Sequence, residues 1–331
     1  MDKNAKISLP AKVARILNTL GGHGYEAYAV GGCVRDSLLG RMPQDWDITT
    51  SARPEQVKAL FRHTIDTGIQ HGTVTVMLDH EGFEVTTYRI DGEYEDARHP
   101  KEVAFTANLL EDLKRRDFTI NAMAYNEVTG LVDAFDGIGD LERGVIRCVG
   151  NAMERFSEDA LRMLRAVRFA AQLGFSIEQE TQEAIAGLAG NIKKVSAERI
   201  QVELVKLLTS PNPGELKVAY RMGLTAVFLP EFDVMMETPQ NNPHHCCSVG
   251  EHTLKAIEAV PADKVLRLTM LLHDIAKPAC RTTDKKGVDH FYGHPVRGSE
   301  MARGILRRLK FDNDTIDRVC RLVHWHDDNP E

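Results

Sequence analysis

The pattern of apolar and polar positions changes its period near residue 150. Before it, short apolar runs typical of strands alternate with amphipathic segments typical of helices. Expected strands span 25–30, 45–50, 73–79, 83–90 and 131–135, and expected helices span 10–21, 33–39, 54–62 and 117–124. Beyond it, helical segments are expected at 157–173, 178–189, 196–209 and 214–223, and again from Glu251 onward. The pattern predicts an α+β region, a small mixed sheet with helices, followed by an all-α region.

Breaker residues divide the helical part further. Asn212-Pro213-Gly214 and Leu229-Pro230-Glu231 interrupt it, and 239–250 (PQNNPHHCCSVG) is typical of an irregular loop. A chain of 331 residues is long enough for two or three domains. We therefore expect divisions at 1–150, 151–235 and 236–331.

Composition indicates an ordinary globular protein, with 43% hydrophobic and 27% charged residues. No apolar run is long enough to span a bilayer, and the first residues do not have the pattern of a signal peptide. The six cysteines form no CxxC pair, which argues against a zinc ribbon or a disulfide framework. A reducing cytoplasm is the expected location.

The net charge of −7 means that any contact with RNA must come from a local basic surface. Basic side chains cluster at several places that could provide one, although such runs are often only solvated faces. These are Arg162, Arg165 and Arg168, then Lys193 and Lys194, then Arg303, Arg307, Arg308 and Lys310.

Residues 31–48 (GGCVRDSLLGRMPQDWDI) carry the strongest chemical signal. Residues i and i+2 of a strand point to the same face, so Asp45 and Asp47 can converge while Trp46 packs on the other side. Two carboxylates held that close need a cation between them, and oxygen ligands suit Mg²⁺. Glycines let a backbone approach a ligand closely. The combination predicts an enzyme that handles a nucleoside triphosphate with a metal ion.

A third carboxylate, Glu84, lies in the strand pattern GFEVTTYR, where it shares a face with Thr86 and Tyr88. A carboxylate in the middle of such a strand suits a core poorly. It is either a partner of the aspartates or a surface charge on an edge strand. Further on, Asp117 of the Arg115-Arg116-Asp117 motif precedes an apolar stretch and is placed to cap a helix.

The segment SEDALRMLRAVRFAA predicts a mostly buried helix with a polar stripe, Asp159, Arg162, Arg165 and Arg168 at a spacing of three. At 3.6 residues per turn the stripe drifts, so Arg168 faces away from Asp159. Asp159 and Arg162 could form a structural ion pair. Alternatively, the pair could read a base: an aspartate accepts from the exocyclic amine of cytosine or adenine, and an arginine donates to the ring. Uracil and guanine have a carbonyl in the place of that amine, and its oxygen would oppose the carboxylate.

A histidine-rich pattern occupies the C-terminal part: His252, His273-Asp274 and Asp327. Histidine and carboxylate ligands from separate helices suit a divalent transition metal or Mg²⁺. Further ligands could come from His290, His294, His324 and His326. The site is either an active phosphohydrolase centre or a structural module.

The motif order GGCVRDSLLGR…DWDI, RRDFTINAMAYN at 115–126 and SEDALRMLRAVRFAAQLGF at 157–175 resembles the class II tRNA nucleotidyltransferases. These are the bacterial CCA-adding enzymes and the bacterial poly(A) polymerases, and the C-terminal part resembles the HD domain found in some of them. The resemblance, from about residue 12 onward, implies a polymerase beta-like nucleotidyltransferase head, a helical neck and body, and a helical HD region. Relatives usually continue into a tail that grips tRNA, so we expect a C-terminal truncation.

The resemblance also implies roles for the residues singled out above. Asp45 and Asp47 would hold Mg²⁺, and Glu84 would help to activate the attacking hydroxyl. The Gly32 backbone and Arg35 would contact the triphosphate, and the 115–117 motif the sugar or phosphates, through Arg116. The base would be read by the family's EDxxR pattern, here Glu158-Asp159-x-x-Arg162, assisted by Arg165; Arg168 is included in the expected nucleotide-binding set.

The implied function is the addition of CCA to tRNA 3′ ends with CTP and ATP. A polar loop expected at 91–113 corresponds to one that the family needs for the final A. Poly(A) polymerase is the alternative within the same chemistry. A phosphohydrolase with a nucleotide-binding head, and a non-catalytic RNA-binding module, are alternatives of other classes. The histidine-rich site should prefer Ni²⁺, Co²⁺ or Mn²⁺.

Overall fold

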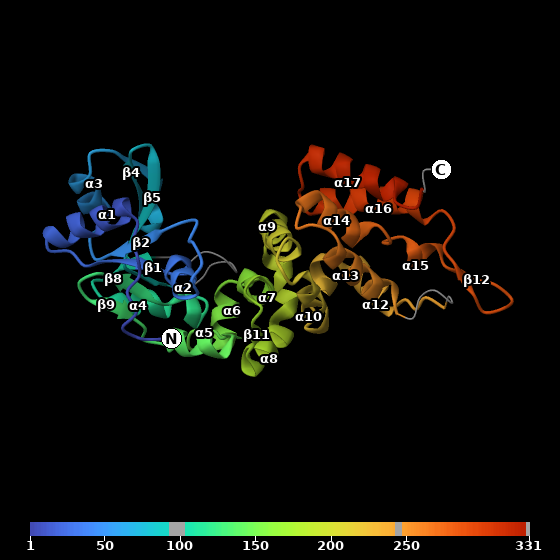
Figure 1. Cartoon of the computed structure of the whole chain (residues 1–331), viewed down its shortest axis with the longest axis horizontal. Coiled ribbons are helices and arrows are strands. Elements are labelled where there is room, and N and C mark those ends of the chain that lie inside the picture. The colour runs from blue at the N-terminus through green and yellow to red at the C-terminus, as the bar shows by residue number, and fades with distance from the viewer. Residues whose placement is uncertain (93–102, 242–246, 329–331) are drawn as a thin grey trace. The chain divides into compact units, whose positions relative to one another are not determined.

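The computed structural model describes residues 1–92, 103–241 and 247–328. The chain divides into two compact units, Met1–Glu158 and Asp159–Glu331. Unit 1 mixes strands and helices and unit 2 is almost entirely helical (Figure 1). The predicted order of an α+β region followed by helices is confirmed.

Unit 1 contains a seven-stranded sheet with the strand order β3-β4-β5-β2-β1-β8-β9. β2 and β5 pair in parallel, and the other neighbours are antiparallel. Its elements are α1 (Ala11–Gly22), β1 (Ala27–Val30), α2 (Gly32–Leu38), β2 (Asp47–Thr50), α3 (Pro54–Leu60), β3 (Thr64–Gly68), η1 (Ile69–His71), β4 (Thr73–Leu78), β5 (Glu81–Thr87), β6 (Arg89–Asp91), β7 (Val103–Phe105), α4 (Leu109–Lys114), η2 (Thr119–Asn121), β8 (Ala124–Asn126), β9 (Gly130–Val132), α5 (Gly137–Arg143), β10 (Val145–Ile146) and α6 (Ala152–Glu158).

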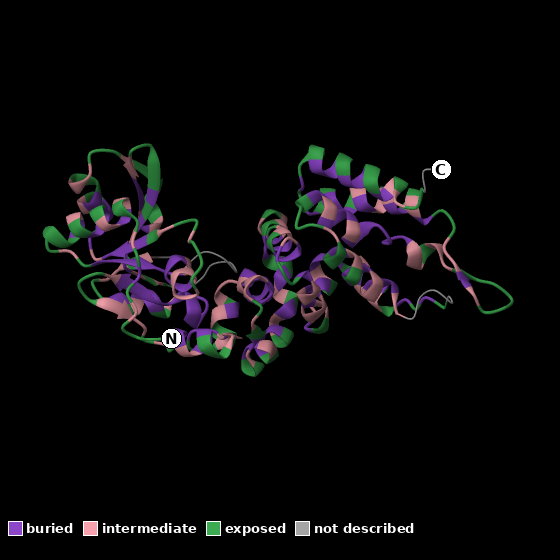
Figure 2. Cartoon of the chain, viewed as in Figure 1, coloured by how far each residue is buried: buried purple, intermediate pink, exposed green. Residues whose placement is uncertain are grey.

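The two faces of this sheet are covered differently. On one face, alternate strand residues such as Ile48 and Val85 pack against Ile16 of α1 and Val57 of α3 in one apolar cluster. On the other face, a smaller cluster joins Tyr28, Val30 and Tyr88 to Leu109 and Leu113 of α4. Buried residues accordingly follow the strands in Figure 2. The second face therefore carries the smaller apolar cluster, to which α4 contributes.

Unit 2 is built from amphipathic helices whose apolar stripes face one another. Helices α16 and α17 show this as alternating buried and exposed bands in Figure 2. Its elements are α7 (Leu161–Leu173), β11 (Ser176–Ile177), α8 (Gln179–Leu188), η3 (Ala189–Lys194), α9 (Ala197–Leu208), η4 (Pro213–Glu215), α10 (Leu216–Arg221), α11 (Thr225–Phe228), α12 (Pro230–Glu237), α13 (Val249–Ala259), α14 (Lys264–Leu272), α15 (Lys277–Cys280), β12 (Thr282–Thr283), β13 (Asp289–His290), α16 (His294–Arg308) and α17 (Asn313–Trp325).

Three element predictions are wrong in type or continuity. The helix expected at 117–124 is a short 3₁₀ turn, η2, followed by strand β8, which pairs with β1. An apolar run of this length does not distinguish a buried strand from a helix, which is why the prediction failed. The strand expected at 83–90 is divided into β5 and β6. The helix expected at 157–173 is interrupted at Asp159-Ala160, between α6 and α7.

The prediction of a loop at 91–113 is also wrong for the second half of this segment. Residues 103–105 form β7, which pairs with β6, and residues 109–114 form α4. Apolar Leu109 and Leu113 of α4 pack into the second cluster, so this segment is part of the sheet's covering. Residues 93–102 lie outside the described part of the chain.

Candidate active sites

Three carboxylates lie near one end of the sheet in unit 1. β2 pairs in parallel with β5, Ile48 opposite Val85. The residues before these, Asp47 and Glu84, therefore stand on neighbouring strands, on the face that α1 and α3 leave open. Asp45 precedes β2 by two residues, and all three carboxylates are exposed.

The electrostatics of this group favour a bound cation. Desolvation raises the pKa of Asp47, and repulsion from Glu84 and Asp45 raises it too, while the charge of Arg116 lowers it. Asp47 remains exposed to solvent, so a cation can reach its carboxylate. Carboxylates that repel one another in this way are stabilised by a divalent cation, and hard oxygen ligands suit Mg²⁺. The residues present fit such an ion.

The glycine turn lies directly beside these carboxylates. β1 pairs with β2 in antiparallel fashion, Val30 opposite Asp47, so Gly31 and Gly32 follow at the same end of the sheet. Gly31 has a φ of 83°, a conformation that favours glycine. A Cβ atom on Gly32 would lie 3.4 Å from Nη2 of Arg35. The absence of side chains here lets Arg35 fold back over the turn.

Arg35 is buried, and Asn121 and Asp36 are among the groups that hold it. Its Nη1 donates to Oδ1 of Asn121 at 2.5 Å, and its Nε donates to Asp36 at 3.0 Å. Nδ2 of Asn121 in turn donates to Asp117 at 3.3 Å. The 115–121 motif therefore positions the arginine of the glycine motif. The prediction that Asp117 caps an α-helix is wrong, because the turn that follows is 3₁₀ and Phe118 occupies its N-cap position.

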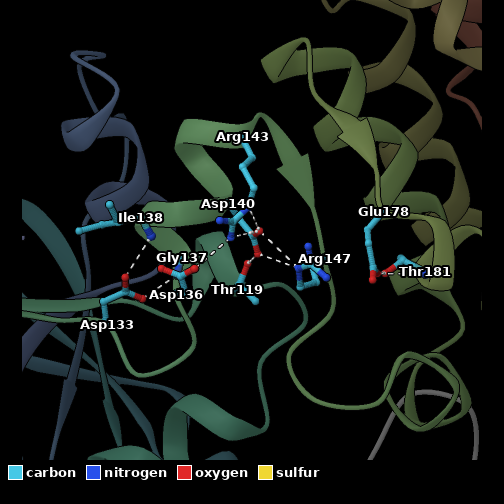
Figure 3. A network of polar contacts seen from close by, with 10 residues as sticks. All are labelled: Thr119, Asp133, Asp136, Gly137, Ile138, Asp140, Arg143, Arg147, Glu178 and Thr181. Atoms are coloured by element: carbon cyan, nitrogen blue, oxygen red, sulfur yellow. Dashed lines mark hydrogen bonds and ion pairs between the residues drawn. The ribbon is translucent and has the colours of Figure 1, made fainter.

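A second polar network anchors the same turn (Figure 3). Oγ1 of Thr119 donates to Oδ2 of Asp140 at 2.6 Å, and Asp140 is only 1% exposed. Arg143 and Arg147 donate to this carboxylate at 2.8 and 3.2 Å. Asp133 accepts from the first two backbone N–H groups of α5 at 2.7 and 3.0 Å and so fixes the helix that carries Asp140.

Arg116 is positioned by Asp112, which sequence reasoning missed. Asp112 is fully buried and accepts from Arg115 Nε and Arg116 Nη2, both at 3.2 Å. Thr49 of β2 also donates to it, at 3.1 Å. Burial alone would raise the pKa of Asp112, but the two arginines hold it below its usual value. Nη1 of Arg116 lies 3.6 Å from the position of a Cβ on Gly31, so this contact directs Arg116 to the glycine turn.

The spacing of Asp112 from the two arginines, three and four residues along a helix, was the available signal. This spacing was not recognised because residues 91–113 were expected to form a loop.

The expected base-reading residues lie at the start of α7 in unit 2. Oδ1 of Asp159 accepts from the backbone N–H of Leu161 at 3.1 Å. Its carboxylate also forms a bidentate pair with Arg199 of α9, at 3.2 and 2.8 Å. Arg162 and Arg165 are half-buried on α7. Arg199, which sequence reasoning did not single out, therefore holds Asp159 in a fixed orientation.

Arg168 has a different position from the rest of the stripe. It is 6% exposed, and its Nε and Nη2 donate to Glu203 at 2.7 and 3.2 Å. Glu203 is itself 5% exposed, so the pair is internal to unit 2. This placement runs against the expectation that Arg168 binds nucleotide, because its charge and donors are used inside the helical core.

Four histidines gather around Asp274 in unit 2. Its Oδ2 lies 3.5 Å from Nε2 of His252 and 3.2 Å from Nε2 of His273. Its Oδ1 lies 3.2 Å from Nε2 of His294 and 3.6 Å from Nε2 of His326. These side chains come from α13, the end of α14, the start of α16 and the end of α17.

The contacts of Asp274 fit a metal ion. Both of its oxygens are buried, yet among residues 1–92, 103–241 and 247–328 none of their contacts has hydrogen-bond geometry. Burial alone would raise the pKa of Asp274, but His273, His294 and His326 hold it well below its usual value. The cluster contains two groups that share Asp274, one with His252 and His273 and one with His294 and His326, and within each group the ligand atoms lie within 4.8 Å of one another. Imidazole nitrogens and a carboxylate oxygen at such distances suit a divalent transition metal.

The remaining candidates around this cluster divide into two groups. Asp327 is exposed and lies 3.3 Å from both His294 and His326. His290 instead contacts Asp284 at 3.0 Å, and His324 packs against a tryptophan ring. Sequence reasoning missed Lys277, whose Nζ lies 2.9 Å from Oδ2 of Asp274.

Residues 27–147 match the family described as Poly A polymerase head domain. Residues 174–236 match a probable RNA and SrmB-binding site of polymerase A, and residues 244–331 match the HD domain. No helix in the described ranges 1–92, 103–241 and 247–328 is both long and apolar enough to cross a membrane.

Several curated relatives are CCA-adding enzymes. The one from Lactiplantibacillus plantarum is 54% identical over 198 residues, which are 60% of this chain and 49% of the relative. The one from Enterococcus faecalis is 51% identical over 201 residues, which are 61% of this chain and 50% of the relative. The chain thus spans about half the length of the curated relatives it matches.

A solved structure extends this similarity over nearly the whole chain. The CCA-adding enzyme of Bacillus stearothermophilus in complex with CTP is 36% identical with a TM-score of 0.70, covering 94% of this chain and 68% of that one. This match includes both the polymerase beta-like head and the helical region that follows it. On this basis the chain belongs to the family of CCA-adding tRNA nucleotidyltransferases, with a poly(A) polymerase-type head and an HD domain.

Proposed function

We propose that the protein adds CCA to the 3′ end of tRNA in the cytoplasm, using CTP and ATP. The observation that carries this proposal is the convergence of Asp47, Glu84 and Asp45 beside the glycine turn that Arg35 covers. The similar proteins are named CCA-adding enzymes, which supports CCA addition as the reaction. In this proposal residues 1–150 form the catalytic head, 151–235 the neck and body, and 236–331 the HD domain.

Each residue of the head has a proposed task. Asp45 and Asp47 hold Mg²⁺, which neutralises phosphate charge when bound. Glu84 accepts the proton of the tRNA 3′-hydroxyl while the hydroxyl oxygen bonds to the α-phosphorus of the nucleotide. The bond from the α-phosphorus to the oxygen that bridges to the β-phosphate breaks, and pyrophosphate leaves. Arg35 and the Gly32 backbone hold the triphosphate, and Arg116 contacts the sugar or phosphates.

Base choice is assigned to unit 2. Asp159 accepts from the exocyclic amine of cytosine or adenine, and Arg162, assisted by Arg165, donates to the ring. The pair with Arg199 fixes the direction of the Asp159 carboxylate, so that a carbonyl of uracil or guanine would face a negative charge. We assign Arg168 to the core rather than to the nucleotide.

The experiment that tests this function gives the protein tRNA lacking CCA, with each nucleoside triphosphate separately and with CTP and ATP together. CCA addition predicts two C residues with CTP alone and a third residue, A, only when both are present. Long A tracts would indicate poly(A) polymerase. Equal incorporation of all four nucleotides, or none, would contradict both.

A second function is supported by the HD cluster. We propose that His252, His273, Asp274, His294, His326 and Asp327 hold one or two divalent metal ions of the Ni²⁺, Co²⁺ or Mn²⁺ type and that the site hydrolyses a phosphoester. The buried oxygens of Asp274 carry this proposal, because none of their contacts with the described residues has hydrogen-bond geometry. Water oxygen would bond to phosphorus while the ester P–O bond breaks, and the leaving alcohol would take a proton.

A further inference from the structure

The short helix α6 (Ala152–Glu158) forms the end of unit 1 and leads directly into the expected base-reading residues. Asp159 follows its last residue, and the break at Asp159-Ala160 separates α6 from α7. The course of the chain at Asp159 therefore depends on how the end of α6 is held. Among the described residues of this helix, only Phe156 is buried, so apolar packing holds it mainly at one point.

Arg155 supplies a second point of attachment within unit 1. Its Nη1 donates to the backbone carbonyl of Lys114, the last residue of α4, at 2.8 Å. Its Nη2 lies 2.7 Å from the carboxylate of Glu158, the last residue of α6. Only 15% of the Arg155 side chain is exposed, so both contacts are largely shielded from solvent. The guanidinium therefore bridges the C-terminal ends of two helices.

The two ends that this bridge joins lead to different parts of the nucleotide site. Lys114 stands two residues before Arg116, whose Nη1 is directed to the glycine turn. Glu158 stands one residue before Asp159. Arg155 thus ties the segment before the arginine that contacts the sugar or phosphates to the segment before the aspartate that reads the base.

The chemistry of the bridge favours an arginine over other side chains. The last carbonyl groups of a helix lack partners within the helix and carry partial negative charge, so a cation that donates to them is stabilising. The carboxylate of Glu158 adds a full negative charge at the second contact. A lysine would supply the same charge as a compact point, whereas the planar guanidinium serves two separate acceptors in fixed directions.

A cavity of about 330 Å³ lies beside this bridge within unit 1. Lys114, Arg155 and Glu158 line it, and Phe135 and Val149 are among its apolar residues. The space that α4 and α6 both border is therefore not filled by packed side chains. On this side of the helices the polar bridge, rather than packing, keeps the two ends together.

We propose that Arg155 is a positioning residue for base selection. It fixes the chain immediately before Asp159 to the segment that carries Arg116, so that the base and the sugar of one nucleotide are held in register. Arg199 orients the Asp159 carboxylate within unit 2, and Arg155 holds the chain from which Asp159 departs. The inference rests on the proposed addition of nucleotides and on the base-reading role of Asp159.

The primary test compares incorporation of CMP with incorporation of UMP into tRNA lacking CCA. Arg155→Ala should lower the ratio of kcat/KM for CTP to kcat/KM for UTP about tenfold, because the reading group is misplaced while Phe156 still holds α6. The kcat for CTP should change little, since strand register holds the catalytic carboxylates and Asp112 holds Arg116. Arg155→Lys, which keeps the charge but not the fork, should lose selection in the same way.

Two further variants separate the bridge from its surroundings. Lys114→Ala removes an exposed side chain but keeps the backbone carbonyl that Arg155 contacts, so selection should be unchanged. Glu158→Gln keeps an acceptor without its charge and should lose less selection than Arg155→Ala. Urea unfolding measures stability in parallel. Variants of Arg155 that are less stable but select CTP as the wild type does would show a structural role and overturn the proposal.

Chemical rescue supplies a measurement that a structural role would not affect. The cavity beside Arg155 leaves room for a small cation, so guanidinium ion at millimolar concentration should restore the selection of CTP by Arg155→Ala. Urea has nearly the same planar shape without the charge and should not restore it. Selection that guanidinium does not restore, or that urea restores equally, would contradict the role of the guanidinium at this bridge.

Equilibrium binding separates the failure of this inference from the failure of the function on which it rests. Calorimetric titration of the whole chain with CTP and with UTP, in the presence of Mg²⁺, measures base selection without any transfer reaction. Selective binding that Arg155→Ala loses, in a protein that adds no nucleotides, would keep the positioning role and remove the transferase function. CCA addition with the same selectivity in the wild type and in both Arg155 variants would keep the function and overturn the inference.

Discussion

The two acidic centres of this molecule use their carboxylates in opposite ways. In the head, Asp45, Asp47 and Glu84 are exposed on an open sheet face, and repulsion contributes to the raised pKa of Asp47. In the HD cluster, Asp274 is buried among imidazoles that hold its pKa well below its usual value. The first arrangement suits a hard cation held by oxygen ligands. The second suits a borderline metal held by nitrogen ligands.

The two centres also differ in the structural elements that hold their groups in place. The head centre depends on strand register, since the pairing of β2 with β5 and β1 sets the distance between its groups. The HD cluster depends on the packing of four helices, each of which supplies one or two ligands. Loss of a ligand should therefore affect chemistry in the head and both chemistry and packing in the HD cluster.

The largest expected effect is at the head. Asp45→Ala or Asp47→Ala should lower nucleotide incorporation into tRNA by at least about 10²- to 10³-fold, because phosphate charge would lose its neutralising ion. Circular dichroism should show an intact fold. Glu81→Gln, an exposed carboxylate at the start of β5, serves as the control and should be unaffected. Near-normal incorporation by either folded aspartate variant would contradict the assignment of Asp45 and Asp47 as Mg²⁺ ligands.

The second prediction concerns the independence of the two centres. His273→Ala combined with Asp274→Ala should remove any phosphoesterase activity and metal binding of the HD cluster and leave incorporation of CMP and AMP within about twofold. His324→Ala, a histidine of α17 outside the cluster, is the matched control. The variant must first be shown to be folded, because His273 and Asp274 are buried. A folded double variant that no longer adds nucleotides would show that the centres are coupled.

The third prediction concerns base choice. Asp159→Asn and Arg162→Ala should raise misincorporation of UMP and GMP relative to CMP and AMP about 10- to 100-fold, since a charge-assisted hydrogen bond is lost. Arg199→Ala should produce a smaller loss in the same direction, because it only orients Asp159. Glu180→Gln on α8 is the control. Slow variants that still reject UTP and GTP would show that the helix is structural.

Local motifs in the sequence predicted which side chains lie near one another better than they predicted the secondary structure between these motifs. The DxD pair and the HD dipeptide are short, and their spacing specifies which atoms converge. The 3₁₀ turn at 119–121 and the strand after it were missed because FTINAMAY is apolar at six of its eight positions, so its pattern does not distinguish a helix from a buried strand. Pairing with β1 decides its conformation. Partners distant in the sequence, such as Arg199 for Asp159, leave no local signal.

The most specific prediction compares two aspartates of the head under the same substitution. Asp112→Asn should lower the free energy of unfolding by about 3 kcal/mol, because Arg115 and Arg116 lose their buried counter-charge. It should also reduce incorporation, since Arg116 is no longer directed to the glycine turn. Asp47→Asn should instead raise the metal-free stability by less than about 1 kcal/mol, because it removes repulsion at an exposed site.

The pH dependence of stability should separate these two aspartates. The pKa of Asp112 is lowered by its arginines, so its stabilising contribution is complete above its unfolded-state pKa of about 3.9 and disappears as the pH falls through the lower folded value. The pKa of Asp47 is raised, so its penalty is complete above the folded value and disappears below about 3.9. Urea unfolding between pH 3 and pH 7 in chelator measures both differences. If both variants shift stability in the same direction, the contrast between a buried clamp and an open repelling site is wrong.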